Sequence, residues 1–330
     1  MGKVKINVNT ALPYLILGSM FVIFGITTKG QIFTASNLMN LFNQSAATII
    51  AGLGMMFVAA MGGTDITHGS LAALAATFAS MAAMAVGAWA MIPVAILTGA
   101  LSGFLLGVIN ARFKVPSFMV SLSLLIAYRA LVNLLLNSAS YIVPDAVKVL
   151  DGFWVKLLCV VVMALVAGYV LKSTPFGRYT CAIGENENAV KFTGVNVNKT
   201  KIAAYVISGV MAAIAGIFLV ARVGGTNNTL GSGFEMKVMM AMFIGGIPVQ
   251  GGFGTKTYKL ILGAPTIILL ENGLVLLGAT GGVTQLIRGL LLLLAVFIAQ
   301  FVYARFGEGK ANRAGKSLPG AEGLPGKQSV

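Results

Sequence analysis

Residues 69–88 read GSLAALAATFASMAAMAVGA, a run without a single Asp, Glu, Lys or Arg. About 20 apolar residues is the length that a helix needs to cross the hydrocarbon core of a bilayer. Gly, Ala and Ser dominate the run, and such small side chains let helices approach closely in lipid. The stretch therefore predicts a transmembrane helix packed inside a bundle.

The composition of the whole chain agrees with this stretch. Of its 330 residues 57% are hydrophobic and only 10% are charged, whereas a soluble domain carries about 25% charged residues. The net charge of +14 would indicate nucleic acid in a soluble protein, but here the basic residues lie between apolar runs, where they set membrane topology. We therefore expect a lipid bilayer around the chain and no nucleic-acid partner.

Apolar segments recur along the chain. The first follows Lys3 and Lys5 like a signal peptide, but it lacks a small-x-small cleavage site and is long enough to span, so we interpret it as a retained span. The eighth is too short for a full crossing. We predict ten segments, at residues 11–28, 45–62, 68–87, 90–109, 116–138, 153–172, 201–221, 234–247, 258–279 and 283–304.

The Lys and Arg residues orient these segments. With the N-terminus inside, 16 of the 23 fall on the cytoplasmic side, 5 on the outer side and 2 within spans. This bias favours ten segments with both termini in the cytoplasm. The fold class is thus an all-α polytopic membrane protein, with one transmembrane domain over residues 1–304, a short or discontinuous segment near 231–254, and a disordered cytoplasmic tail over 305–330.

The longest interior polar loop covers residues 173–200, STPFGRYTCAIGENENAVKFTGVNVNKT. Its GENENAVKF portion predicts about two helical turns, with Glu185 and Glu187 in the first turn and Lys191 in the last, as the helix dipole favours. Gly194 would end the helix. A short cytoplasmic helix with both signs of charge suits docking into a groove of a partner, and an ordinary solvated loop is the alternative.

Several polar residues lie in or beside the apolar segments. Asp65 is flanked by glycines between two spans, where it or Thr67 could simply cap the third span. Glycines bracket the short run within 231–255, and interrupted spans of this kind mark pathways in transporters. Intramembrane polar residues usually face a bundle interior or water. The candidates for a translocation pathway are Asp65, Asn110, Arg129, Asn133, Glu235, Glu271, Asn272 and Arg288.

Two of these candidates have opposite charges at similar depths. Glu271 and Arg288 lie eight and five residues from the outer ends of their spans, or roughly 12 and 8 Å deep. We expect them to form an ion pair, the alternative being two separate charges that reach toward the interface.

Nucleotide and metal sites are not predicted. The run from Gly315 to Ser317 resembles the end of a P-loop, but Lys310 occupies the position of the required glycine, and no strand precedes it. The only histidine is His68, which excludes a His-rich metal site. We therefore expect no cofactor and no enzymatic activity; if transport uses ATP, the motor is a separate chain.

Together these stretches resemble the permease family of ribose-, xylose- and galactoside-type ABC importers over about residues 36–300. The positions that resemble family motifs are Gly62, Gly63, Asp65, Ile66, Thr67, Gly69 and Ser70; Ile109, Asn110, Pro116, Phe118 and Arg129; Phe176, Gly177, Arg178, Ala182, Ile183, Gly184, Asn186, Ala189, Gly194 and Asn196; Tyr205, Ile207, Ser208, Gly209, Ala215, Gly216, Ile217, Ala221 and Arg222; Gly231, Gly233, Glu235, Ile244, Gly245, Gly246, Gly251, Gly252 and Gly254; and Asn272, Gly273 and Leu274.

The resemblance implies a subunit in a bacterial inner membrane that translocates a small polar solute, most simply a monosaccharide, by alternating access. It implies a second permease subunit, an ABC ATPase subunit and a periplasmic or lipoprotein solute-binding protein. The residues that would couple to the ATPase are Gly184, Glu185, Asn186, Glu187, Ala189 and Gly194. The chain departs from the family at His68, Val190, Lys237, Pro248 and Glu271, which leaves the solute open. Permeases for nucleosides, autoinducers or branched-chain amino acids, and an ATP-independent secondary transporter, are the alternatives.

Overall fold

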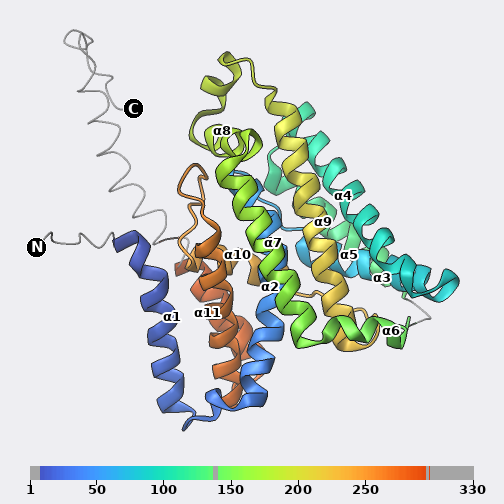
Figure 1. Cartoon of the computed structure of the whole chain (residues 1–330), viewed down its shortest axis with the longest axis vertical. Coiled ribbons are helices and arrows are strands. Elements are labelled where there is room, and N and C mark those ends of the chain that lie inside the picture. The colour runs from blue at the N-terminus through green and yellow to red at the C-terminus, as the bar shows by residue number, and fades with distance from the viewer. Residues whose placement is uncertain (1–7, 137–139, 295–296, 298–330) are drawn as a thin grey trace, which may run out of the picture.

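The chain folds into a bundle of helices with α8 at one end and α6 at the other, as the computed structural model shows (Figure 1). It describes residues 8–136, 140–294 and 297, and within these ranges no named strand occurs. In the described part of the chain, seven helices are long and apolar enough to cross a membrane. They are α2 (Ala35–Ala60), α3 (His68–Val86), α4 (Met91–Phe113), α5 (Ser117–Leu135), α7 (Phe153–Ser173), α9 (Val197–Val223) and α11 (Thr257–Leu276).

Three further helices complete the predicted set. They are α1 (Val8–Thr27), α10 (Phe234–Ile244) and the helix Gly281–Leu294. Each of the ten predicted segments thus corresponds to a helix, and the eighth is short as predicted. The all-α polytopic fold is confirmed. The remaining elements are α6 (Asp145–Lys148), α8 (Pro175–Phe192) and three single turns, η1 (Gln31–Phe33), η2 (Ala88–Ala90) and η3 (Val149–Asp151).

The start of α2 was predicted ten residues too late. The helix begins at Ala35, because the polar stretch before residue 45 turns inward and finds partners within the protein. Asn37 is buried and donates from Nδ2 to the carbonyl of Ile32 at 2.9 Å, and Asn43 accepts a hydrogen bond from Lys156. The last predicted segment begins at Gly281; its end, the tail 305–330 and the N-terminal lysines lie outside the described residues.

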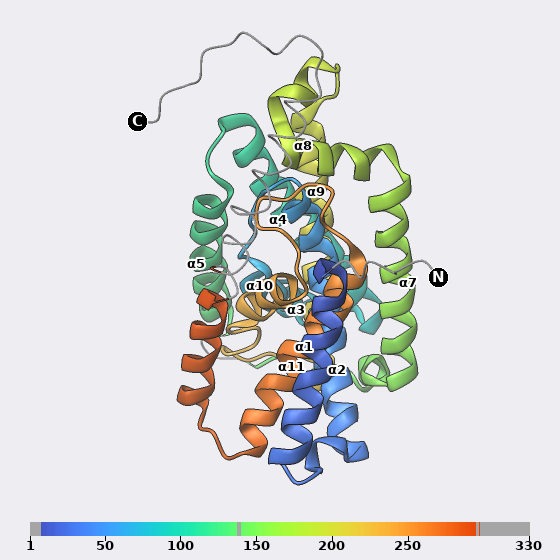
Figure 2. The same cartoon turned by 90° about the vertical axis from the view of Figure 1, so that its left-hand side faces the viewer.

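The helices differ in how much of their surface the bundle covers. α2 is buried along most of its length, while α5 and α7 stand at opposite flanks (Figure 2) and expose apolar side chains such as Leu134 and Leu165. Apolar side chains on the outside are what lipid requires. The membrane interior of the protein therefore lies between the flanks, around α2, α3, α9 and α10.

Small residues allow α4 to pack directly on α9. A Cβ atom built on Gly103 would lie 2.7 Å from Cα of Val206, and one built on Gly107 would lie 2.9 Å from Cα of Ile202. Neither atom of the partner can move without moving its helix. The spacing of four residues places both glycines on one face of α4, as in other close helix pairs in membranes.

We predict that Gly103→Leu lowers the free energy of unfolding by about 1–3 kcal/mol or more, because α4 and α9 must separate to admit the side chain. Thermal unfolding in detergent micelles measures it. The matched control is Gly18→Leu in α1, where a Cβ atom has nothing within 4 Å. Equal melting temperatures for the two variants would contradict this close contact.

Candidate functional site

The predicted cytoplasmic loop is mostly helix. We expected two turns within 173–200, but α8 already begins at Pro175, after Thr174 accepts a hydrogen bond from the amide of Gly177 at 3.2 Å. Proline at the first position of a helix fixes a favourable φ and loses no hydrogen bond, which is why the helix begins at Pro175. A second cap divides α8: Asn186 leaves helical geometry (φ −162°, ψ 99°) and its Oδ1 accepts from the amide of Ala189 at 3.0 Å.

Two of the predicted coupling residues contact the rest of the bundle. Oε1 of Glu185 accepts from the amide of Phe253 at 3.1 Å. A Cβ atom on Gly184 would lie 2.6 Å from the amide nitrogen of Gly252, which itself donates to the carbonyl of Ala60 at 2.8 Å. Gly184 and Glu185 therefore hold α8 against the end of α2 and the α10–α11 loop.

The last turns of α8 form its free surface. Glu187 bonds to Lys191 and Lys201, both at 2.7 Å. Burial opposes ionisation of Glu187, and the hydrogen bonds from the two lysines outweigh it, so the pKa of Glu187 lies below its usual value. Ala189 is exposed, Gly194 ends the segment with φ +79°, and the side chain of Phe192 is 92% exposed. A nearly bare phenylalanine at the tip of a polar helix is the signal that our sequence analysis missed.

Asp65 belongs to a buried polar cluster at the start of α3. Its Oδ1 accepts from the amide and the hydroxyl of Thr67, at 3.0 and 2.7 Å, so Asp65 rather than Thr67 makes the cap contacts. Its Oδ2 accepts from Ser208 of α9 at 2.8 Å, and Ser208 Oγ lies 3.2 Å from Nε2 of His68. Ser208 was a motif position but not a predicted pathway residue, because nothing local links it to a partner 143 positions away.

The Asp65, His68 and Ser208 side chains share the composition of a hydrolase triad but not its arrangement. The Ser208 hydroxyl has one proton, so it serves either Asp65 or His68 at a time. All three residues are at most 2% exposed, which leaves no room for a substrate at the hydroxyl. The cluster is thus a cross-link between α3 and α9.

Two further charged residues, Glu235 and Arg129, lie close to the Asp65 cluster. Glu235, in the first turn of α10, packs against Gly69 and has a buried Oε2 without a hydrogen-bond partner. Arg129 interacts electrostatically with Glu235 and donates from Nη1 to the carbonyl of Leu230 at 2.8 Å. The structure therefore brings Arg129, Glu235 and the Asp65 cluster together between α3, α5 and α10.

The three amide candidates differ in their surroundings. Asn133 lies on the exposed face of α5, and Asn272 has a buried Oδ1 without a partner. Asn110 donates from Nδ2 to the carbonyl of Val115 at 2.9 Å, which closes the turn between α4 and α5. A cavity of about 170 Å³ brings Asn110 to Ser117, Glu187 and Tyr205 at the α8 end of the bundle. Asn133 follows Arg129 by one turn on the same face of α5.

Glu271 and Arg288 form the expected ion pair, at 2.7 Å between Oε1 and Nη2. A third group joins them, because Nζ of Lys237 in α10 lies 2.7 Å from Oε2 of Glu271. Lys237 lies in the first turn of α10, so one buried acid binds α10, α11 and the helix Gly281–Leu294 together.

The other end of α10 is held by a lysine from α11. Lys259 is buried, and its Nζ donates to the carbonyls of Gly246 and Gly254 at 2.7 and 2.9 Å. A cation at a helix C-terminus satisfies free carbonyls and opposes the helix dipole. Lys259 is the third residue of α11. α10 is thus a half-helix of 11 residues, with Glu235 in its first turn and the Lys259 ammonium at the carbonyls beyond its end.

Residues 37–296 match the family described as "Branched-chain amino acid transport system / permease component". The chain belongs to this permease family. It is 32% identical to the ribose import permease protein RbsC of Escherichia coli (strain K12), over 82% of this chain and 88% of that protein. It is 30% identical to the fructose import permease protein FrcC of Rhizobium meliloti, over 88% and 85%. No solved structure matches the chain.

The permease has a further relative in the xylose transport system permease protein XylH of Haemophilus influenzae, at 27% identity over 90% of this chain and 98% of that protein. The resemblance to sugar ABC importer permeases is therefore confirmed, and with it the place of this chain in the cell membrane. Permease subunits of this kind are not the catalytic part of their transporters. Within the described residues, no group of three or more His, Cys, Asp and Glu could hold a metal ion.

Proposed function

We propose that this permease is the membrane-spanning subunit of an ATP-driven importer and moves a monosaccharide across the membrane by alternating access. A solute-binding protein delivers the sugar, a second permease subunit completes the pathway, and an ATPase subunit docks on α8. The similarity to permeases named for ribose, xylose and fructose supports a sugar.

The exposed tip of α8 is the observation that carries this proposal. Glu185 and Gly184 fix the start of the tip to the bundle, and Phe192 projects from its end. A docked partner that moves this tip would therefore also move the α10–α11 loop. The half-helix α10 between Gly233 (φ +71°) and Gly246 (φ +81°) supplies a segment that can be displaced as a unit, in keeping with broken helices in other transporters.

Reconstitution tests the proposal. The permease would be placed in proteoliposomes with the ATPase and the solute-binding protein encoded beside its gene, and uptake of radiolabelled ribose, xylose and fructose would be followed. We expect uptake of at least one sugar to require ATP and the binding protein, and to be unaffected by collapse of ion gradients. Uptake that follows an imposed ion gradient without ATP would contradict it and favour a secondary transporter.

A further relative supports autoinducers as the alternative class of solute. The chain is 31% identical to the autoinducer 2 import system permease protein LsrC of Photorhabdus laumondii, over 84% of this chain. Including autoinducer 2 among the labelled solutes distinguishes the two classes in the same experiment.

A further inference from the structure

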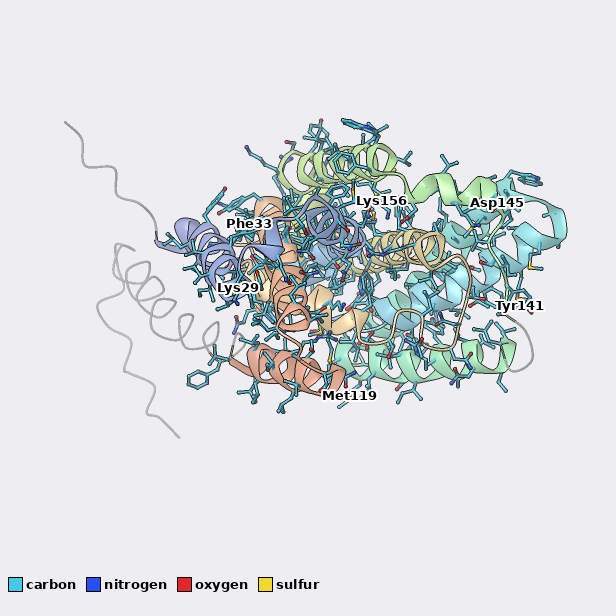
Figure 3. All side chains as sticks on the ribbon, turned by 90° about the horizontal axis from the view of Figure 1, so that it is seen from below. Lys29, Phe33, Met119, Tyr141, Asp145 and Lys156 are labelled. Atoms are coloured by element: carbon cyan, nitrogen blue, oxygen red, sulfur yellow. The ribbon has the colours of Figure 1, made fainter. Side chains whose placement is uncertain are left out.

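The cavity of about 170 Å³ lies where the end of α2 meets α4, α5, α8 and α9, and most of its lining is polar. It lies at the end of the bundle with α8 (Figure 1), which the distribution of Lys and Arg assigns to the cytoplasm. Figure 3 views the molecule from the opposite end, where Tyr141 and Asp145 lie. The cavity is larger than the roughly 150 Å³ that admits benzene in an engineered protein, so it has room for one sugar ring.

Two hydroxyl groups of the lining have one proton to spare. Oη of Tyr205 and Oγ of Ser117 are hydrogen-bonded to each other, and Ser117 Oγ also accepts from the amide of Thr64 at 3.0 Å. Each hydroxyl has one proton, so the bond between them uses one of the two. The other proton has no acceptor among the described residues, and a molecule bound in the cavity would supply one.

The other polar groups of the lining add acceptors and further donors. Asn110 donates from Nδ2 to the carbonyl of Val115, and its Oδ1 accepts from no described group, so this oxygen remains an acceptor. Lys201 gives one N–H to Glu187 at 2.7 Å, and an ammonium has two others. The Glu187 carboxylate has about four lone-pair sites, of which the two lysines use two. The cavity therefore offers donors and acceptors together.

The charges of the lining cancel. Glu187 and Lys201 are its charged residues, and they pair with each other. Lys191, the second partner of Glu187, lies outside the lining and is 48% exposed, so solvent screens its charge. A charged ligand would find no unpaired counter-charge in the cavity. A neutral compound with several hydroxyl groups fits better, because each hydroxyl both donates and accepts.

We propose that this cavity binds a neutral sugar at the last site before the cytoplasm, and that the bound sugar contacts α8 through Glu187. That the compound is a transported sugar rests on the proposed function; its neutrality and its many hydroxyl groups are inferred from the cavity. Tyr205 or Ser117 would donate to the sugar, Asn110 would accept from it, and Lys201 would donate beside Glu187. Release of the sugar and the position of α8 would then depend on each other.

Binding to the permease alone tests this inference. The full chain would be placed in nanodiscs of phosphatidylcholine and titrated with ribose, xylose, fructose and glucose, with binding followed by saturation-transfer NMR. Glucuronate and glucosamine serve as the anionic and cationic counterparts of glucose. We expect at least one neutral sugar to bind, and both charged compounds to bind more weakly than that sugar.

Two variants then assign the binding to the cavity. The double variant Ser117→Ala, Tyr205→Phe removes both hydroxyls and keeps the aromatic ring. Lys201→Met removes the ammonium, while Glu187 keeps its bond to Lys191. Each variant should weaken binding of the sugar by about five-fold or more, which is the effect of losing one hydrogen bond.

Each variant has a matched control. Ser102 donates to the hydroxyl of Tyr128 at 2.7 Å, a second serine–tyrosine pair between α4 and α5 that does not line the cavity. Lys199 is exposed and lies two residues before Lys201 in α9. The double variant Ser102→Ala, Tyr128→Phe and the single variant Lys199→Met should bind the sugar as the unchanged chain does. Thermal unfolding of all four variants shows that each is folded.

Three outcomes would overturn the inference: no neutral sugar binding, a charged compound binding more tightly than every neutral sugar, or an affinity that is unchanged in Ser117→Ala, Tyr205→Phe or in Lys201→Met. Because no ATPase is present, these outcomes are independent of ATP-driven uptake. If reconstituted uptake succeeds while no sugar binds, the cavity is assigned wrongly and the importer stands. If ATP-driven uptake fails while the variants weaken binding, the cavity stands and the proposed function is wrong.

Discussion

Glu271→Gln is expected to destabilise the permease more than any other single charge removal in the bundle. The side chain of Glu271 is 8% exposed and pairs with both Lys237 and Arg288, which are themselves 22% and 14% exposed. Removing the acid leaves two like charges facing each other with no counter-ion. Breaking a buried ion pair from one side costs about 3–5 kcal/mol, because the partner remains buried and unpaired. Thermal unfolding in detergent micelles would measure the loss.

The net charge left among Lys237, Glu271 and Arg288 predicts how the stabilities of the other variants rank. Arg288→Gln leaves the neutral pair of Lys237 and Glu271, and Lys237→Gln leaves the neutral pair of Arg288 and Glu271, so each should cost clearly less than Glu271→Gln. The double variant Glu271→Gln, Arg288→Gln leaves one cation and should be more stable than Glu271→Gln alone. If Glu271→Gln melted no lower than either cation variant, the shared carboxylate would not hold the three helices together.

Hydropathy was enough to locate all ten segments, because lipid makes the apolar run itself the signal. The start of α2 escaped this reasoning. Asn37, Asn40 and Asn43 look like the residues of a loop, and only their partners, the Ile32 carbonyl, Arg222 and Lys156, show why they are helical. Those partners lie on other elements, so no local pattern reveals them.

The sequence identified several residues of the candidate site but few of the contacts between them. Depth along the spans was sufficient to pair Glu271 with Arg288, since helices rise uniformly. It could not add Lys237, because the rotation of the half-helix α10 about its axis is set by packing. Likewise the motif around Gly184 located α8, but the direction of each side chain was not visible: Glu185 turns to the Phe253 amide, and Phe192 turns outward.

Phe192 is expected to carry the attachment of the ATPase. Because its side chain is 92% exposed, Phe192→Ala should leave the melting temperature of the permease unchanged. A large aromatic group at the centre of a docking surface commonly contributes about 2 kcal/mol or more to binding, or roughly 30-fold in affinity. Loss of the ring should therefore separate the permease from its motor without unfolding it.

The matched control is Phe113→Ala. Phe113 ends α4 at the same end of the bundle and is 70% exposed, so it tests whether any exposed phenylalanine on this side has the same effect. We expect Phe113→Ala to bind the ATPase as the unchanged chain does.

The affinity of the permease in nanodiscs for the ATPase encoded beside its gene, measured with the unchanged chain, Phe192→Ala and Phe113→Ala, tests the central claim most directly. The account predicts tight binding by the unchanged chain and by Phe113→Ala, and roughly 30-fold weaker binding by Phe192→Ala at equal thermal stability. Equal binding by all three chains would contradict docking on α8, and no binding by the unchanged chain would contradict an ATP-driven importer.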